Sequence, residues 1–204
     1  MILAVLILMC AAVLLFHNTS ENNRVEEESI DTVTKLEELV ESNSALLKDE
    51  ENLESNINYT NLDINSSIGT KTSIKINGLT YIGIIYIPSL NNLATPVIDT
   101  CTEKNLKVSV CRYAGNLESN NMVIAGHNYK SIFGKLSKLA IGDIAYFKDL
   151  EGNVYKYKCK EIIKLQENDV EKMQIGDWDL TLFTCTYDGK ERLTFRFELT
   201  DYNY

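Results

Sequence analysis

The chain has 204 residues, of which 45% are apolar and 24% are charged, as suits one folded domain with additional segments. Its 20 basic and 29 acidic residues give a net charge of −9, so we expect no nucleic acid or other polyanion as a partner. The five cysteines form no C-x-x-C pair, which argues against a zinc site or a redox dithiol. Cys101 and Cys111 would pair only if their strands were neighbours, and we interpret each as a buried free thiol.

Residues 1–16 are almost wholly apolar and are predicted to form a transmembrane signal anchor. The stretch is slightly shorter than the roughly 17–25 residues of a membrane span, and no Lys or Arg precedes it. A cleaved signal peptide and a buried helix are the alternatives, but no small-x-small cleavage pattern with a clean boundary follows. We therefore expect a single-pass protein of the cell membrane, with the rest of the chain outside the cell.

Residues 17–70 are polar, acidic and rich in Asn, Ser and Glu. Within them a weak amphipathic helix is indicated by apolar residues at steps of three, four and seven, namely Ile30, Val33, Leu36, Val40 and Leu47. We interpret the segment as a solvated, partly helical stalk or linker that holds the next domain away from a membrane. The alternative is a short coiled coil, or a helix that packs on the domain.

Residues 71–204 have the texture of a β domain, with short runs of Ile, Val, Tyr and Thr punctuated by Gly, Asn and Asp. Roughly eight strands in this length favour an all-β fold, a closed barrel or a sandwich. Short helices are expected at Ser131–Leu139 and around Asp169–Met173. The expected strands are Ser73–Ile76, Tyr81–Ile87, Pro96–Ile98, Asn121–Ala125, Ile144–Lys148, Asn153–Ile163, Leu180–Cys185 and Arg192–Leu199.

The stretch from Asp179 to Leu199 reads as two strands around a short turn, because its apolar residues alternate with polar ones at period two. Asp188-Gly189 lies in the connection, a dipeptide that tolerates positive φ in a tight hairpin. The first strand ends on the Cys185 thiol, and the second begins with the Arg192 guanidinium. Strand ends are where a rigid scaffold presents reactive groups to solvent.

His127 is a third candidate residue. It follows the apolar run that ends in Ala125-Gly126, at the point where the expected strand ends. A lone histidine in this position is more often structural, but here Cys185 and Arg192 also lie at strand ends. A cysteine nucleophile needs a proton acceptor or a stabilising cation, and donors where the carbonyl oxygen gathers charge. By spacing alone, the three residues indicate a cysteine transferase or hydrolase.

Two motifs resemble those of the sortases, membrane-anchored transpeptidases of Gram-positive bacteria. They are Ala125-Gly126-His127-Asn128, and Thr181-Leu182-Phe183-Thr184-Cys185 followed by Arg192. The resemblance covers about Thr70 to Leu199 and includes Gly83-Ile84-Ile85-Tyr86-Ile87-Pro88. It implies an eight-stranded β-barrel, which agrees with the strand count reached independently.

The resemblance also implies a reaction. Sortases cleave a C-terminal sorting motif of the Leu-Pro-x-Thr-Gly kind in secreted proteins, between Thr and Gly. Cys185 would form a thioester with the Thr carbonyl, and an amine of a peptidoglycan precursor or a pilin lysine would resolve it. His127 would be the acid and base, and Arg192 would bind the oxyanion or the substrate backbone.

The alternatives concern one residue and the reaction class. Arg196 is the alternative to Arg192 as the catalytic arginine. A cysteine hydrolase that releases the acyl group to water and a non-catalytic binding module are the alternatives.

Three neighbouring residues are candidates for substrate binding: Ala125, Asn128 and Thr184. Asn128 would orient His127 or cap the following helix, and Thr184 would shape the pocket or pack in the sheet. The Leu165–Trp178 loop carries Glu167, Asp169, Glu171 and Asp177. In some sortases a glutamate of the corresponding loop helps to bind calcium. We interpret this loop as a solvated acidic loop and expect no metal or cofactor. The sortase subclass stays open.

Overall fold

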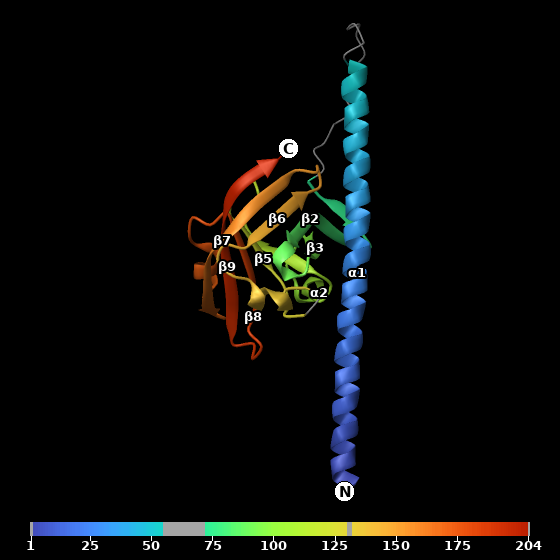
Figure 1. Ribbon diagram of the computed structural model, residues 1–204, viewed down its shortest axis with the longest axis vertical. Helices are drawn as coiled ribbons and strands as arrows, with labels where there is room; N and C mark the ends of the chain where they lie inside the picture. The colour runs from blue at the N-terminus through green and yellow to red at the C-terminus, as the bar shows by residue number, and fades with distance from the viewer. Residues whose placement is uncertain (1, 55–71, 130–131, 204) are drawn as a thin grey trace.

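The computed structural model describes residues 2–54, 72–129 and 132–203, without the side chains at positions 18, 21, 43–54, 202 and 203. The expectations that concern Thr70 and Ser131 fall outside the described residues, as does the side chain of Leu47. Figure 1 shows a β-barrel beside one long helix. The elements are α1 (Ile2–Glu54), β1 (Ile74–Ile76), β2 (Leu79–Ile87), η1 (Pro88–Leu90), β3 (Leu93–Ile98), α2 (Glu103–Leu106), β4 (Val110–Ala114), β5 (Met122–Ala125), η2 (Gly134–Lys138), β6 (Ile144–Asp149), β7 (Val154–Gln166), α3 (Val170–Gln174), β8 (Leu180–Cys185) and β9 (Glu191–Asn203).

The strands of the described residues form one sheet in the order β1-β2-β3-β4-β5-β8-β9-β7-β6. An additional pairing of β2 with β6 joins the two sides of this sheet, so the eight strands from β2 to β9 close into a barrel. β1 pairs only with β2 and lies outside the closed ring. Most neighbours are antiparallel, whereas β3–β4 and β5–β8 are parallel. The expected closed eight-stranded barrel is confirmed.

The membership of the barrel differs from the expectation in two ways. Every expected strand is present, but β4 was not expected, and β1, which was counted, is an added strand of the β1–β2 hairpin. Asn77 and Gly78 form the turn of this hairpin with φ values of 50° and 82°. The strand expected at Pro96–Ile98 begins earlier, at Leu93, so Pro96 lies inside β3, opposite Ile84. β4 pairs with β3 only from Val97 onward, so a missing N–H is tolerated at Pro96.

The barrel interior is filled by the inward-facing side chains of every second strand position. Leu180 and Leu182 of β8 and Phe195 and Phe197 of β9 all belong to this core and have at most 1% of their surface exposed. The η2 region seals one part of it, where Phe133 and Leu136 are fully buried. The alternation predicted for the β8–β9 hairpin is therefore confirmed, and it fixes which residues point outward.

α1 is continuous from the apolar segment through the polar one. Its apolar side chains up to Phe16 are exposed, with Leu3 at 72% and Phe16 at 76%. By length and composition, α1 could cross a membrane, and its most apolar window has no part buried in the protein. Such a helix alone is weak evidence of a membrane span, because a signal sequence has the same properties.

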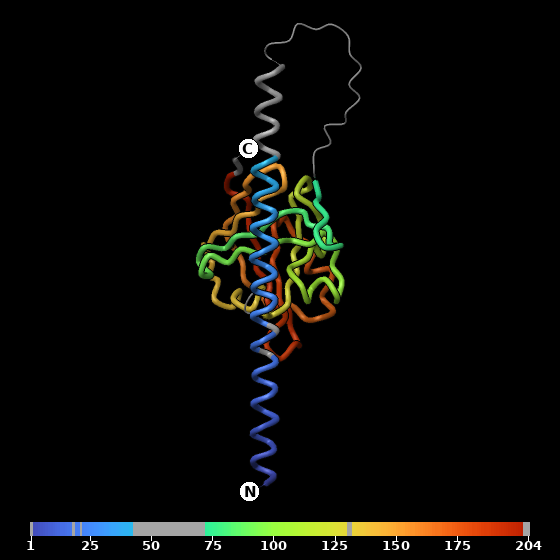
Figure 2. The backbone as a smooth tube through the Cα atoms, turned by 90° about the vertical axis from the view of Figure 1, so that its right-hand side faces the viewer, coloured from blue at the N-terminus to red at the C-terminus, as the bar shows by residue number. Residues whose placement is uncertain are grey.

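Residues 25–40 of α1 are not a solvated stalk. Figure 2 shows the helix lying along the barrel, with its N-terminal part projecting past it. Val25, Val33, Leu36 and Val40 are buried, and the last three join Ile84 and other strand residues in a second apolar cluster. For these residues the preferred interpretation, a solvated stalk, is wrong, and the alternative, a helix that packs on the domain, is the one observed. Ile30, which the amphipathic pattern included, is 60% exposed.

Candidate active site

The β8–β9 hairpin places Cys185 and Arg192 directly opposite each other, as the last and second residues of their strands. The connecting turn is held by local hydrogen bonds: the Gly189 N–H donates to the Thr186 carbonyl at 2.9 Å, and the Thr186 hydroxyl donates to Asp188 at 2.7 Å. That hydroxyl bond holds the pKa of Asp188 below its ordinary value. Gly189 has a φ of 75°, as the predicted turn requires. A short, ordered turn thus fixes the thiol and the guanidinium as neighbours.

Strand alternation puts Cys185 on the outer face of the barrel, together with Phe183 and Thr181. Thr184 lies on the opposite face of β8, the face of the core residue Leu182. Its Oγ1 is buried and has no hydrogen-bond partner. This placement supports the packing interpretation of Thr184 rather than contact with a ligand beside the Cys185 thiol.

β5 brings His127 to the same place. β5 and β8 are parallel, Ala125 lies opposite Phe183, and the Gly126 N–H continues the ladder by donating to the Phe183 carbonyl at 3.1 Å. His127 and Cys185 follow two residues beyond this pair, at the same end of adjacent strands. Gly126 must lack a side chain, because a Cβ there would approach the Phe133 ring to 2.7 Å.

Burial and two charged side chains shift the pKa of the half-buried His127 ring. Burial lowers its pKa most strongly; the negative Glu103 side chain raises the pKa, and the positive Lys107 lowers it. Both residues belong to the α2 region, between β3 and β4. The ring also contacts that of Tyr129, with centroids 5.2 Å apart. The neutral imidazole is therefore favoured over the imidazolium relative to a solvated histidine.

We expect the pKa of His127 to move in opposite directions when these two charges are removed. Lys107→Gln removes a cation and should raise the pKa, whereas Glu103→Gln removes an anion and should lower it. Titration of the imidazole signals by NMR measures both shifts, and the only other histidine, His17, is assigned with His17→Gln. Both shifts should shrink in 1 M salt, where the screening length is about 3 Å. Shifts of the same sign in the two variants would contradict this electrostatic assignment.

Arg196, the rival arginine, is held in a structural network. Its guanidinium donates to the Lys172 carbonyl at 2.6 Å, pairs with Glu161 at 3.3 Å and lies 5.6 Å from the centre of the Trp178 ring. It lies opposite Thr181, four residues from Arg192 along β9 and hence about 13 Å from it. Arg196 therefore ties β9 to the segment before β8, and Arg192 is the arginine beside Cys185.

The acidic loop after β7 reaches Arg192. Glu167 accepts a hydrogen bond from Arg192 Nη2 at 3.1 Å, while Arg192 Nη1 donates to the Gly189 carbonyl. Asp169 instead pairs with Lys172 at 3.0 Å, which lowers the pKa of Asp169. Within the described ranges, no group of three or more His, Cys, Asp or Glu side chains could hold a metal ion.

An apolar patch on the outer face of the barrel adjoins these side chains. Ala125, buried at 4% exposure, belongs to it with Phe183 and Met173. Tyr113 of β4 packs its ring edge-on against Phe183, with centroids 5.3 Å apart. Asn128 is exposed next to His127. Of the three substrate-binding candidates, Ala125 thus lies on the outer face with Phe183, Asn128 is exposed next to His127 in the sequence, and Thr184 lies on the inner side.

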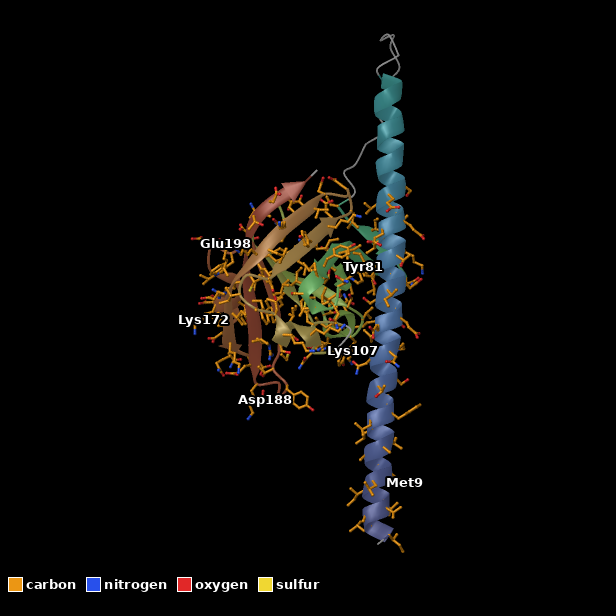
Figure 3. All side chains as sticks on the ribbon, in the orientation of Figure 1. Met9, Tyr81, Lys107, Lys172, Asp188 and Glu198 are labelled. Atoms are coloured by element: carbon orange, nitrogen blue, oxygen red, sulfur yellow. The ribbon has the colours of Figure 1, made fainter. Side chains whose placement is uncertain are left out.

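Sequence reasoning missed three neighbours of the trio. Tyr129 and Lys107 flank His127, and Glu167 was expected only as part of a solvated loop. Figure 3 shows Lys107 on the side of the barrel nearer α1. The proximity of Tyr129 in sequence to His127 was the one available signal, because α2, whose C-cap is Lys107, had not been recognised.

Comparisons with known proteins agree with this arrangement. The family model for the sortase domain matches residues 85–200. Sortase A of Listeria monocytogenes is 25% identical, with a TM-score of 0.56 over 60% of this chain and 89% of that one. For sortase C1 of Streptococcus agalactiae the identity is 25% and the TM-score 0.53, over 62% and 71% of the two chains.

A sortase D5 transpeptidase of Clostridium perfringens is 24% identical and shares the fold, with a TM-score of 0.53 over 59% of this chain and 79% of that one. A search of curated proteins finds no match. The family model covers more than half of the chain. The chain belongs to the sortase family.

Proposed function

We propose that this protein is a cysteine transpeptidase that cleaves a C-terminal Leu-Pro-x-Thr-Gly-like motif of secreted proteins between Thr and Gly. The observation that carries the proposal is the convergence of Cys185, Arg192 and His127 at the ends of β8, β9 and β5. Membership of the sortase family supports the reaction class. The acyl group passes to an amine of a cell-wall precursor or to a pilin lysine.

In the first half-reaction, the Cys185 thiol passes its proton to the neutral His127 ring, and the resulting thiolate sulfur attacks the Thr carbonyl carbon. Negative charge develops on the carbonyl oxygen, and Arg192 donates hydrogen bonds to that oxygen or to the substrate backbone. Because a guanidinium stays protonated at all relevant pH values, this stabilisation needs no proton transfer. His127 gives its proton to the departing Gly nitrogen, and the C–N bond breaks to leave a thioester.

In the second half-reaction, an incoming amine attacks the thioester carbonyl. His127, now neutral, takes the proton of the amine, and the carbon–sulfur bond breaks to regenerate the Cys185 thiolate. Burial, which lowers the pKa of His127, favours the neutral base needed here. Water would compete with the amine, and its exclusion decides whether the enzyme acts as a transpeptidase or a hydrolase.

The Glu167 ion pair occupies one side of Arg192 before substrate arrives. Glu167 is 67% exposed, so this pair is screened and contributes at most about 1 kcal/mol. Arg192 is only 18% exposed and keeps its hydrogen bond to the Gly189 carbonyl. Substrate can therefore displace Glu167 at little cost while the turn continues to hold the guanidinium.

We infer that the apolar part of α1 anchors the enzyme in the cell membrane, with the barrel on the extracellular side. Asp188, in the turn between Cys185 and Arg192, marks the end of the barrel nearest the apolar part of α1 (Figure 3). Docking of residues 25–40 on the barrel joins the anchor rigidly to the domain. This geometry supports a site that faces the membrane, where sorting motifs and membrane-borne acceptors arrive.

The function is tested with the full-length protein in detergent and a library of fluorogenic Leu-Pro-x-Thr-Gly-like peptides, with and without an added amine. We expect cleavage of a subset of the library and a ligated peptide–amine product only when the amine is present. Cleavage with unchanged products in the presence of amine would identify a hydrolase instead. Absence of cleavage across the library would contradict the proposed substrate class.

A further inference from the structure

Cys101, in the segment between β3 and α2, lies close to Cys111 of β4. β3 and β4 are parallel neighbours, and Ile98 lies opposite Cys111. Three residues beyond Ile98, the chain turns toward α2, and Cys101 packs on the apolar cluster that contains Cys111. The two thiols are close enough for each to shift the pKa of the other, and the Cys111 thiol donates to the Ser109 carbonyl at 3.7 Å. β3 and β4 are neighbouring strands, although Cys101 itself lies beyond the end of β3, and both thiols are free, as expected from the sequence.

The two thiols are unequal. Cys101 is half-buried, whereas Cys111 has none of its surface exposed. The interaction with Cys111 holds the pKa of Cys101 below its ordinary value, and the same interaction together with burial raises the pKa of Cys111. An accessible thiol with a lowered pKa next to a buried second thiol is the arrangement of redox-responsive cysteine pairs.

We propose that Cys101 and Cys111 form a reversible disulfide by exchange with a small-molecule disulfide, with Cys101 attacking and Cys111 resolving. The Cys101 thiolate attacks one sulfur of the small disulfide, whose S–S bond breaks and releases one thiol. Cys111 then loses its proton and attacks the Cys101 sulfur, which releases the second thiol. The protein loses two hydrogens and is oxidised, and the small disulfide is reduced to two thiols.

The bond would fix the start of α2 to β4. Cys101 directly precedes Thr102, whose side chain accepts from the Asn105 N–H and caps α2. α2 and the residue after it supply Glu103 and Lys107, the two charges that act on His127. Cys101 also packs on the outer apolar cluster of Ala125 and Phe183. The redox state of the pair therefore acts on the wall of the candidate site, which goes beyond the proposed acyl transfer.

The other cysteines of the described residues lack this arrangement. Cys159 is fully buried, burial raises its pKa to about 11, and its thiol donates to the Glu161 carbonyl at 3.8 Å. Cys185 is the proposed nucleophile, and Cys10 lies in the apolar part of α1. Cys159 is therefore the internal control for a buried thiol, and Cys185→Ala removes the nucleophile from the assay.

The test uses full-length Cys185→Ala protein in detergent, treated with glutathione disulfide, quenched by alkylation and mapped by peptide mass spectrometry. We expect a disulfide between Cys101 and Cys111, formed about tenfold or more faster than any modification of Cys159. Cys111→Ser should stop at a glutathione adduct on Cys101, and Cys101→Ser should leave Cys111 unmodified. A stable glutathione adduct on Cys101 with Cys111 intact, or an unreactive Cys101, would overturn the proposal. None of these outcomes depends on the acyl-transfer activity.

Discussion

Arg192→Ala is expected to lower kcat/KM for the sorting peptide by about 10²–10³-fold, the usual effect of losing one oxyanion donor. The guanidinium lies opposite Cys185, and its fixed charge is available to the developing oxyanion. Arg192→Lys should recover little of the activity, because an ammonium cannot reproduce the planar fork of donors. Steady-state kinetics with thermal unfolding measured in parallel separate loss of chemistry from loss of fold.

Arg196→Ala is the matched control on the same face of the same strand. It removes the contacts with the Lys172 carbonyl, Glu161 and Trp178, so we expect a loss of about 2 kcal/mol in the free energy of unfolding. Its kcat/KM at a temperature where it is folded should stay near that of the wild type.

Two further comparisons complete this test. Glu167→Gln should change the free energy of unfolding by less than about 1 kcal/mol and leave Arg192 in place. Equal activity loss in Arg192→Ala and Arg196→Ala, with both proteins equally stable, would contradict the assignment.

Cys185→Ala is expected to abolish cleavage and ligation, with a loss on the order of 10⁴-fold or more. Without the sulfur no thioester forms, and the remaining groups can only bind substrate. The unfolding free energy should change by less than about 1 kcal/mol, since Cys185 is only partly buried at a strand end. Cleavage assays and thermal unfolding of the same preparation check both statements.

Cys159→Ala is the control for loss of a thiol elsewhere. Cys159 lies in the barrel core, so its replacement should cost about 1 kcal/mol of stability while leaving cleavage intact. Cleavage that persists in Cys185→Ala, or that is lost in a folded Cys159→Ala protein, would show that the nucleophile has been assigned to the wrong residue.

The parts of the fold that the sequence predicted are those set by local pattern. Period-two alternation and Asp188-Gly189 were sufficient to predict the β8–β9 hairpin, with Cys185 at the end of one strand and Arg192 near the start of the next. The apolar run that ends at Ala125 likewise placed His127 at a strand end. These predictions were right because side-chain alternation and turn geometry depend on neighbouring residues alone.

The features that were missed depend on tertiary context. β4 makes only short ladders, with Val97 and Ile98 on one side and β5 on the other, and its sequence carries an arginine and a cysteine. The docking face of α1 was obscured because its buried positions include Ser29 and Thr32. The Thr32 hydroxyl donates to the Glu28 carbonyl at 2.8 Å, so a polar residue interrupts the apolar stripe. A hydrophobic pattern alone could not show this face.

The residues around the candidate trio could not be predicted for the same reason, because they are brought together by tertiary contacts. The ion pair of Arg192 with Glu167 joins residues 25 positions apart, across β7 and β9. The effects of Glu103 and Lys107 on His127 depend on where the α2 region lies relative to the residue that follows β5. The identity of the trio could be predicted from strand ends and a family resemblance, whereas the groups that tune it required the three-dimensional arrangement.

The central claim is that Cys185 carries the acyl group as a thioester that an amine resolves. Intact-mass spectrometry of full-length protein, mixed with a cleavable sorting peptide in a single turnover, tests it most directly. We predict a peptide adduct that maps to Cys185, is removed by hydroxylamine and disappears faster when an acceptor amine is added. An adduct on another residue, or cleavage without any covalent adduct in rapidly quenched samples, would contradict the account.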